Sequence, residues 1–371
     1  MRVIRAEPGQ LEELVASYRR GEGLLLTHAH QHQQRPAVDV ADGQIGVFTS
    51  GTTGPPRIVE LSRQALETAA AACLARLGWS SGERWMLSLS WAHVGGLAVV
   101  VRCLVGDGVV VPGPAGPFEA AAAVDFLAAH AITRWSLVPT QLARLVRAGL
   151  AAPPSLRSVL LGGAAATPSL LAAAARLGWP VVPSYGLTET GGCVAATPAV
   201  AAVAANPAGT TGCGPALDGN EIRIDDGRIA IRGAQLFSRY LGQPPRVATD
   251  WFVTSDLGRL DDDGNLHVLG RADEVVITGG EKVWPGEVES VLHDQPGVRA
   301  AVVFGVPDAE WGQRLVAVVE GDRVDGARLR ACLRDHLPPW KVPQAITVVP
   351  SLPTLPSGKI DRRRAAGVPS G

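Results

Sequence analysis

The chain has 371 residues, of which 46% are hydrophobic and 19% charged, so it can bury a large core and is not a disordered protein. At about 150 residues per domain, this length suggests two or three domains. The 34 Lys and Arg residues nearly balance the 35 Asp and Glu residues, which argues against a dedicated nucleic-acid-binding protein.

The first half of the chain alternates strand-like and helix-like segments. Strands are predicted at residues 45–49, 85–90, 134–138, 158–161 and from 180, and helices at 62–77, 118–130, 140–148 and 168–177. Ser62 is the expected N-cap of the first helix, because its side chain can accept a hydrogen bond from an exposed backbone N–H group. Alternating strands and helices predict an α/β fold with a parallel sheet and ligand-binding loops at the carboxyl ends of its strands.

The pattern changes after residue 205. Short strands at residues 221–224, 228–232, 251–254 and 266–269 are separated by Asp-Gly turn signals, which predict an antiparallel β region. A helix is predicted at residues 327–336, because Leu329, Cys332 and Leu333 form one apolar face. We expect a domain boundary near residues 269–273, which divides an N-terminal domain, 1–269, from a C-terminal domain, 270–371.

Cysteine usage and the apolar runs favour a cytoplasmic protein. The five cysteines are odd in number, lie far apart and form no C-x-x-C pair, so neither a disulfide framework nor a zinc site is expected. The N-terminus contains acids and no apolar run, so no signal peptide is indicated. The most apolar stretch, residues 95–112, is interrupted by Arg102 and Asp107 and falls short of the ~18 apolar residues of a membrane-spanning helix.

The segment TSGTTGPPR at residues 49–57 is the most informative loop. Its small and hydroxyl-bearing residues allow backbone N–H groups and hydroxyls to surround phosphate oxygens, and Arg57 adds a positive charge. It lacks the G-x-x-x-x-G-K-[ST] pattern of a Walker A loop. Taken alone, the segment is equally compatible with an ordinary Gly/Thr turn.

Four further motifs follow it in order: SYGLTET at residues 184–190, TSDLGR at 254–259, GRADEVVITGGEKVWPGEVE at 270–289 and PSGKIDR at 356–362. With TSGTTGPPR, this series resembles the ANL superfamily of adenylate-forming enzymes over residues 45–363. The resemblance implies a large N-terminal domain of parallel sheets, helices and a small antiparallel β region, with a small mobile α+β C-terminal domain. It also implies a reaction that joins a carboxylic acid to AMP, releases pyrophosphate and passes the acyl group to a thiol.

The resemblance implies which residues bind the triphosphate. The β- and γ-phosphates would be held by Thr49, Ser50, Gly51, Thr52, Thr53 and Gly54. Thr188 would hydrogen-bond phosphate, and Glu189 would hold Mg²⁺. Arg57 ends the loop where the family usually has Lys, so the charge is kept while the donor geometry differs.

Further residues would bind the nucleoside and the reacting carboxylate. Tyr185, followed by Gly186, would stack on adenine, although a core aromatic is the alternative. Asp256 would accept from the ribose hydroxyls, and Arg271 would lie near ribose or phosphate. Lys359 would bridge the carboxylate and the α-phosphate and neutralise charge as the adenylate forms. The three arginines after it, at residues 362–364, are expected to form a solvated basic end.

The acyl pocket is implied by two glycine-rich segments. His93 would border the substrate carboxylate, in a segment where the following glycines permit close backbone approach. The other pocket residues would be Gly162, Gly163, Ala164 and Ser184. A plain strand-to-helix turn at residues 162–164 is the alternative.

The two half-reactions imply domain motion. Lys359 would have to leave before a thiol can approach, so the C-terminal domain would rotate about a hinge at Asp273. Gly279 and Gly280 would leave room for the pantetheine arm of CoA, with a plain β-turn as the alternative. The phosphate loop begins at residue 50, whereas most members of the superfamily carry a longer N-terminal region, so a shortened N-terminal region is expected.

Residues 88–111, 188–194 and 229–242 resemble compact o-succinylbenzoate–CoA ligases of menaquinone biosynthesis. The expected substrates are that acid, ATP with Mg²⁺, and CoA; no nucleic acid and no membrane insertion are expected, and a homodimer is left open. The alternative enzyme is another aryl- or acyl-acid adenylating enzyme that serves CoA or a carrier protein. A nucleotide-binding protein without catalysis is a third reading, disfavoured because Glu189, Asp256, Arg271 and Lys359 are all present.

Overall fold

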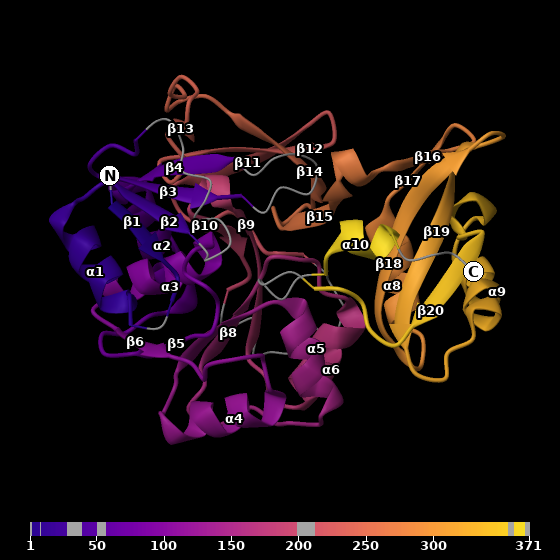
Figure 1. Ribbon diagram of the computed structural model, residues 1–371, viewed down its shortest axis with the longest axis horizontal. Helices are drawn as coiled ribbons and strands as arrows, with labels where there is room; N and C mark the ends of the chain where they lie inside the picture. The colour runs from indigo at the N-terminus through magenta and orange to yellow at the C-terminus, as the bar shows by residue number, and fades with distance from the viewer. Residues whose placement is uncertain are drawn as a thin grey trace.

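The computed structural model describes residues 2–7, 9–27, 39–49, 57–198, 212–354 and 360–367. Figure 1 shows a large N-terminal domain on the left and a smaller C-terminal domain on the right, as the sequence predicts. Residues 50–54 of the predicted phosphate loop and Lys359 lie outside the described residues. Within the described ranges, no helix has the length and apolar composition needed to cross a membrane.

The first sheet carries the strands on either side of the predicted phosphate loop. In spatial order its strands are β1 (Arg2–Arg5), β2 (Leu24–Thr27), β3 (Gln44–Phe48), β4 (Ile58–Ser62) and β13 (Arg239–Tyr240). The first three run parallel, β4 turns back antiparallel to β3, and β13 pairs antiparallel with β4. The segment at residues 49–57 is therefore the connection of a β-hairpin, as its small residues allow.

The second sheet confirms the predicted parallel sheet. In spatial order its strands are β10 (Gly192–Ala196), β9 (Val181–Leu187), β8 (Ser158–Leu161), β7 (Arg134–Leu137), β5 (Arg84–Leu87) and β6 (Val109–Pro112). All neighbours are parallel except β10, which runs antiparallel to β9. The carboxyl ends of β5, β7, β8 and β9 therefore meet at one edge, where ligands of such sheets bind.

Among the described residues, six helices accompany these two sheets: α1 (Leu11–Arg20), α2 (Arg63–Leu77), α3 (Val94–Val105), α4 (Ala120–Ala129), α5 (Pro139–Arg147) and α6 (Pro168–Arg176). α2 and α3 pack against both sheets: Leu66 belongs to the core of the first, whereas Cys73 belongs to the core that contains Trp85 of the second. α3 is apolar almost all round, as expected of a helix covered on two sides. α3 was not predicted because its valine-rich sequence has no polar face to reveal a helical period.

The predicted N-cap of α2 is confirmed. The Ser62 hydroxyl accepts from the backbone N–H of Ala65 at 3.0 Å. Thr167 caps α6 in the same way, accepting from Leu170 at 3.2 Å. Each such cap satisfies a backbone donor that the helix leaves open and stabilises the protein by ~1 kcal/mol.

A third sheet confirms the predicted antiparallel region. Its strands are β11 (Asn220–Asp225), β12 (Arg228–Gly233), β14 (Phe252–Leu260) and β15 (Leu266–Arg271), all antiparallel to their neighbours. Asp226 and Gly227 between β11 and β12 both have positive φ, +47° and +77°, as the predicted Asp-Gly hairpin turn requires.

The C-terminal domain is an α+β unit. Its strands are β16 (Val276–Thr278), β17 (Glu281–Val283), β18 (Val298–Asp308), β19 (Gly312–Gly321) and β20 (Ala345–Val349), and its helices are α8 (Pro285–His293), α9 (Gly326–His336) and α10 (Arg362–Ala366). β18 and β19 form a long hairpin, and α8 and α9 cover it with Leu292 and Leu333 in one core. The predicted helix at residues 327–336 is confirmed as α9.

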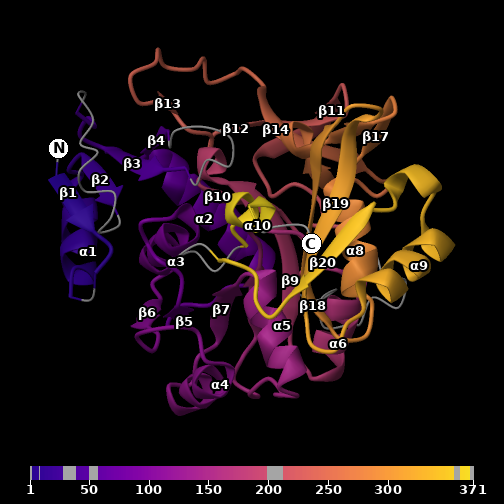
Figure 2. The ribbon, with the colours of Figure 1, turned by 45° about the vertical axis from the view of Figure 1, so that its right-hand side comes forward.

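The two domains meet along α5 and α6. Both Figure 1 and Figure 2 show these helices beside α8 and β18 of the C-terminal domain. Ser169 in α6 donates a hydrogen bond to Asp294, the residue that follows α8. This contact between the domains is polar and lies in the first turn of α6.

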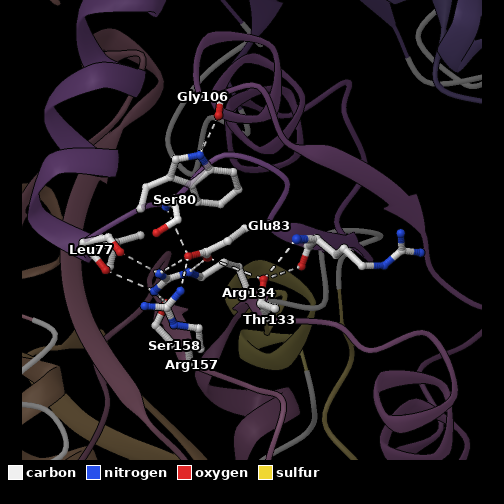
Figure 3. A network of polar contacts seen from close by, with 11 residues as sticks. Leu77, Ser80, Glu83, Gly106, Thr133, Arg134, Arg157 and Ser158 are labelled. Atoms are coloured by element: carbon white, nitrogen blue, oxygen red, sulfur yellow. Dashed lines mark hydrogen bonds and ion pairs between the residues drawn. The ribbon is translucent and has the colours of Figure 1, made fainter.

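A buried ion-pair network fastens the amino ends of the second sheet (Figure 3). Glu83, which precedes β5, pairs with Arg134 at the start of β7 and with Arg157 before β8. Arg134 is 1% exposed and also donates to the carbonyl of Leu77 and to the hydroxyl of Ser158, at 3.1 and 2.9 Å. The network thus lies at the opposite edge of the sheet from the carboxyl ends of its strands.

Candidate active site

The ends of the predicted phosphate loop are held together. The Thr49 N–H donates to the Arg57 carbonyl at 2.8 Å, and the Arg57 N–H donates to the Thr49 hydroxyl at 3.2 Å. Antiparallel pairing of β3 with β4 continues directly from this closure. The Arg57 guanidinium lies over the ring of Tyr240, 4.0 Å from its centroid. The charge predicted at residue 57 is therefore held by an aromatic ring at the base of the loop.

Glu189 lies in the short helix η2 (Thr188–Thr190), which follows β9 directly. Its side chain is almost buried, and its Oε1 accepts a hydrogen bond from the Tyr240 hydroxyl at 2.9 Å. Its backbone carbonyl accepts a hydrogen bond from the backbone N–H of Phe237 at 2.8 Å, and this bond stabilises the turn. In the described ranges no Lys or Arg forms an ion pair with Glu189, so its carboxylate keeps lone pairs for a cation.

The residues predicted for the nucleoside are brought together. The Tyr185 hydroxyl donates to Asp256 Oδ2 at 2.6 Å, across 71 positions of the chain. Burial, and next the Asp256 carboxylate, raise the pKa of Tyr185 well above its ordinary value, so the hydroxyl stays a donor. Arg271 Nη1 lies 3.6 Å from Asp256 Oδ1, since β14 and β15 place these two residues opposite each other.

Gly186 is required by the close approach of two strands. A Cβ at this position would lie 1.9 Å from the carbonyl oxygen of Gly192 on β10. No side chain fits in such a gap. The glycine after Tyr185 therefore permits the pairing of β9 with β10, the two strands that η2 connects.

Two of the predicted pocket segments meet at the carboxyl edge of the second sheet. The Ser184 hydroxyl, on β9, donates to the carbonyl of Leu161 at the end of β8. A Cβ on Gly162 would lie 3.0 Å from that hydroxyl, and Gly163 has a φ of +83°. Ala164 continues the same turn. His93 directly precedes α3 after β5, so it belongs to the same edge of the sheet.

The predicted hinge residue directly follows the third sheet, and the predicted CoA residues lie in the turn between β16 and β17. Asp273 lies in the short helix η3 (Ala272–Glu274) directly after β15, where Arg271 pairs with both of its carboxylate oxygens at 2.8 Å. Gly279 and Gly280 form the turn between β16 and β17, with φ of +57° and +86°. A Cβ on Gly279 would lie 2.8 Å from the ring of Trp311, whereas one on Gly280 would meet nothing within 4 Å.

Arg362 is not part of a solvated basic end, so that prediction was wrong. It pairs with Glu289 of α8 at 2.8 Å and with Glu274 at 3.5 Å, and it donates to the Val303 carbonyl at 2.9 Å. Sequence alone cannot distinguish it from its two basic neighbours, because its partners lie 59 or more positions earlier. Its side chain fastens α10 to the core of the C-terminal domain, next to the segment that carries Lys359.

Tyr240 was missed in the sequence analysis. It occurs in the segment SRYLG, outside the strands predicted at residues 228–232 and 251–254. The structure makes it the contact between Arg57 and Glu189, two residues that belong to different motifs. One sequence signal could have identified Tyr240. It lies near the end of residues 229–242, a segment that resembles the o-succinylbenzoate–CoA ligases along its whole length.

Two family matches cover most of the chain. Residues 5–241 match the AMP-binding enzymes, and residues 287–359 match the C-terminal domain of AMP-binding enzymes. The chain therefore belongs to the AMP-binding enzyme family, and the expected ANL superfamily is confirmed.

Its relatives narrow this class to one kind of ligase. The chain is 38% identical to a probable 2-succinylbenzoate–CoA ligase of Mycobacterium tuberculosis (strain ATCC 25618 / H37Rv), over 98% of this chain and 91% of the relative. It is 32% identical to the 2-succinylbenzoate–CoA ligase of Listeria monocytogenes serotype 4b (strain F2365), over 91% and 73%. The structure of o-succinylbenzoate CoA synthetase from Bacillus subtilis with its acyl-adenylate intermediate is 27% identical, with a TM-score of 0.78, over 97% and 81%.

Proposed function

We propose that this protein is an ATP-dependent acid–CoA ligase that converts o-succinylbenzoate to o-succinylbenzoyl-CoA through an acyl-adenylate. The observation that carries the proposal is the likeness along 98% of the chain to a probable 2-succinylbenzoate–CoA ligase. The paired Tyr185 and Asp256 and the almost buried Glu189 supply the polar groups that the first half-reaction needs. The proposed location is the cytoplasm, whose reducing conditions suit five free thiols.

The nucleotide is bound by groups from three elements. Asp256 accepts from the ribose hydroxyls, and Tyr185 presents its ring to adenine while its hydroxyl keeps the Asp256 carboxylate in place. Arg271 balances the charge of Asp256 and lies beside ribose or the α-phosphate. A carboxylate held by one hydrogen-bond donor and one ion-pair partner has little freedom left to lose when the nucleotide binds.

The residues around the triphosphate fit a magnesium ion. Glu189 offers a carboxylate that no cation neutralises in the described ranges, and these ranges contain no cluster of three metal-binding side chains. Mg²⁺ suits such a site, because it commonly takes one or two carboxylates and completes its shell with phosphates and water. When bound, Mg²⁺ neutralises phosphate charge; Thr188 and the loop that begins at Thr49 hold the phosphate oxygens.

Lys359 supplies the cation for the attack itself. The carboxylate oxygen of the acid attacks the α-phosphorus, a new C(O)–O–P bond forms, and the bond to the β-phosphate oxygen breaks with release of pyrophosphate. A fixed cation next to both anions lowers this barrier, because their repulsion is greatest in the transition state. The acyl pocket is walled by His93, Ser184 and the turn at residues 162–164. These walls keep the carboxylate of the acid in line with the α-phosphorus.

The second half-reaction uses the other face of the C-terminal domain. The proposed boundary lies at residues 269–273, with Asp273 as the hinge, and rotation replaces Lys359 by the β16–β17 turn. Gly280 leaves open space there, so a narrow pantetheine arm can pass. The thiol sulfur attacks the acyl carbon, a thioester forms, and AMP leaves as the C–O bond to phosphate breaks.

A panel of acids tests the proposal. The purified protein is assayed with o-succinylbenzoate, benzoate and a medium-chain fatty acid, with ATP–pyrophosphate exchange and CoA-thioester formation measured in parallel. We expect the highest kcat/KM with o-succinylbenzoate. Equal kcat/KM for benzoate would favour a general aryl–CoA ligase, transfer to a carrier protein but not to CoA would favour the alternative enzyme, and absence of exchange with every acid would refute an adenylating enzyme.

A further inference from the structure

Tyr240 contacts the side chains of two separate triphosphate-binding motifs. Its hydroxyl donates to Glu189 Oε1 at 2.9 Å, and the Arg57 guanidinium stacks on its ring at 4.0 Å. Phe237 packs against the ring as well, with centroids 4.8 Å apart. One side chain therefore holds both the candidate metal ligand and the cation at the base of the phosphate loop.

The backbone of Tyr240 is fixed in place. β13 pairs with β4 so that Tyr240 lies opposite Val59, two residues after Arg57 on the same face of the strand. Its neighbour Arg239 forms an ion pair with the buried Glu60, Nε to Oε2 at 2.6 Å. The pairing and the ion pair hold the Tyr240 backbone in register with β4, so its hydroxyl has a defined position beside the Glu189 carboxylate.

The hydroxyl acts as the donor in this contact, because its partner is the Oε1 atom of the Glu189 carboxylate at 2.9 Å. A phenol that keeps its proton can donate to a carboxylate but does not compete with it for a cation. The hydrogen bond thus occupies one oxygen of Glu189 and orients the group, while the lone pairs that remain can face a metal–phosphate ligand.

We propose that Tyr240 is a positioning residue for the metal-bound triphosphate: its hydroxyl orients the Glu189 carboxylate, and its ring carries Arg57. This inference rests on the proposed function, because it assumes that Glu189 receives the metal ion of a bound nucleoside triphosphate. Orienting the carboxylate in advance removes the cost of ordering a long side chain when the ligand binds. Tyr240 then supports both the candidate metal ligand, Glu189, and the cation at the base of the loop, Arg57.

The variant Tyr240→Phe separates the two contacts, since it keeps the ring and removes the hydroxyl. Binding is measured by calorimetry with ATP plus Mg²⁺, with ATP plus EDTA, and with AMP. We expect an affinity for Mg²⁺-ATP about tenfold lower than that of the wild type, the size of one lost hydrogen bond to a charged group. Affinity for ATP in EDTA and for AMP should not change. The Mg²⁺ concentration at half-maximal pyrophosphate release should rise, with kcat recovered at saturating Mg²⁺.

Two further variants complete the design. Tyr240→Leu removes the ring as well, and we expect it to weaken ATP binding in EDTA, because Arg57 loses its support. Tyr18→Phe is the matched control, since Tyr18 on α1 also carries an arginine over its ring, Arg63 at 5.2 Å. This control should bind all three ligands like the wild type.

The outcomes distinguish this inference from the proposed function. If the wild type binds no ATP under any condition, the proposed function fails. If the wild type binds Mg²⁺-ATP and Tyr240→Phe binds it equally well, only the role of Tyr240 is refuted. An equal loss for Mg²⁺-ATP, ATP in EDTA and AMP would show a general structural role and would also overturn the inference.

Discussion

Arg271 at the end of β15 and Asp273 in η3 form a bidentate ion pair, with Nε to Oδ1 and Nη2 to Oδ2 both at 2.8 Å. The same guanidinium reaches Asp256 Oδ1 at 3.6 Å. The residue proposed as the hinge is thus linked through one arginine to the residue proposed to bind ribose. A change of backbone conformation at Asp273 must break or stretch this pair, so occupancy of the nucleotide site and domain position can influence each other.

We expect Asp273→Pro to block the second half-reaction and to spare the first. Proline fixes φ near −65° and thereby restricts rotation at the proposed hinge. Single-turnover pyrophosphate release should stay near the wild-type rate, while thioester formation should fall about 10²-fold, the scale of a mispositioned reacting group. Asp273→Asn is the control, because it breaks the ion pair without restricting φ. A parallel fall of both half-reactions in Asp273→Pro would contradict the hinge.

The turn at Gly280 provides a test of the CoA path. Both Gly280→Ala and Gly280→Leu introduce a side chain at a φ of +86° and so share the same backbone strain, roughly 1–3 kcal/mol. Only leucine fills the open space beside the turn. We expect thioester formation to fall much further in Gly280→Leu than in Gly280→Ala, with adenylation unchanged in both. Equal thioester yields from the two variants would place the pantetheine arm elsewhere.

Lys359→Ala should impair adenylation far more than folding. Loss of one preorganised contact to a developing charge costs about 2.7–4 kcal/mol, or about 10²–10³ in rate. Acyl-AMP formation measures the rate, and thermal unfolding should shift little. Lys341→Ala serves as the control, because Lys341 is another lysine of the C-terminal domain and pairs with Glu287 at 2.7 Å. Near-wild-type adenylation in Lys359→Ala would remove that residue from the reaction.

The network at Glu83 should control stability independently of activity. Arg134→Met leaves Glu83 buried without its main partner, and breaking a buried pair costs about 3–5 kcal/mol. Arg157→Ala removes the partner whose side chain is 52% exposed, so we expect a loss of at most about 1 kcal/mol. Urea unfolding measures both values. Because the network in Figure 3 lies at the amino edge of the sheet, KM for ATP in the folded variants should match the wild type. Similar losses in both variants would contradict the burial argument.

The Asp261 carboxylate should make the stability of the protein fall more steeply as the pH is lowered. The hydrogen bond with His267 at 2.8 Å, with further donors from Asn265, lowers the pKa of Asp261 to about 2. An unfolded Asp has a pKa of about 3.9, so this contribution to stability is complete above that pH and is lost as the pH falls toward 2. Asp261→Asn should therefore flatten the dependence of Tm on pH between about 4 and 2. Asp262→Asn, at an exposed neighbour, should leave that slope as it is; identical slopes for all three proteins would rule out the pairing.

The sequence alone determined those features that depend on neighbouring residues. The cap at Ser62 and the Asp226-Gly227 turn were predicted because capping and positive φ involve only a few consecutive positions. The alternation of strands and helices predicted the parallel sheet for the same reason. The order of the five motifs indicated the superfamily, since each motif is itself a short segment.

Only the tertiary structure decided which distant residues meet. Tyr240 reaches Glu189 across 51 positions, and Tyr185 reaches Asp256 across 71, because strand order and register bring them together. α3 is helical although its sequence lacks a helical period, since contacts with both sheets replace the polar face that would reveal one. Arg362 differs from the two arginines that follow it because it forms ion pairs with Glu274 and Glu289. The positions of these two residues follow from packing of the C-terminal domain. Local sequence carries no information on such contacts, because their free energy depends on how the whole chain is packed.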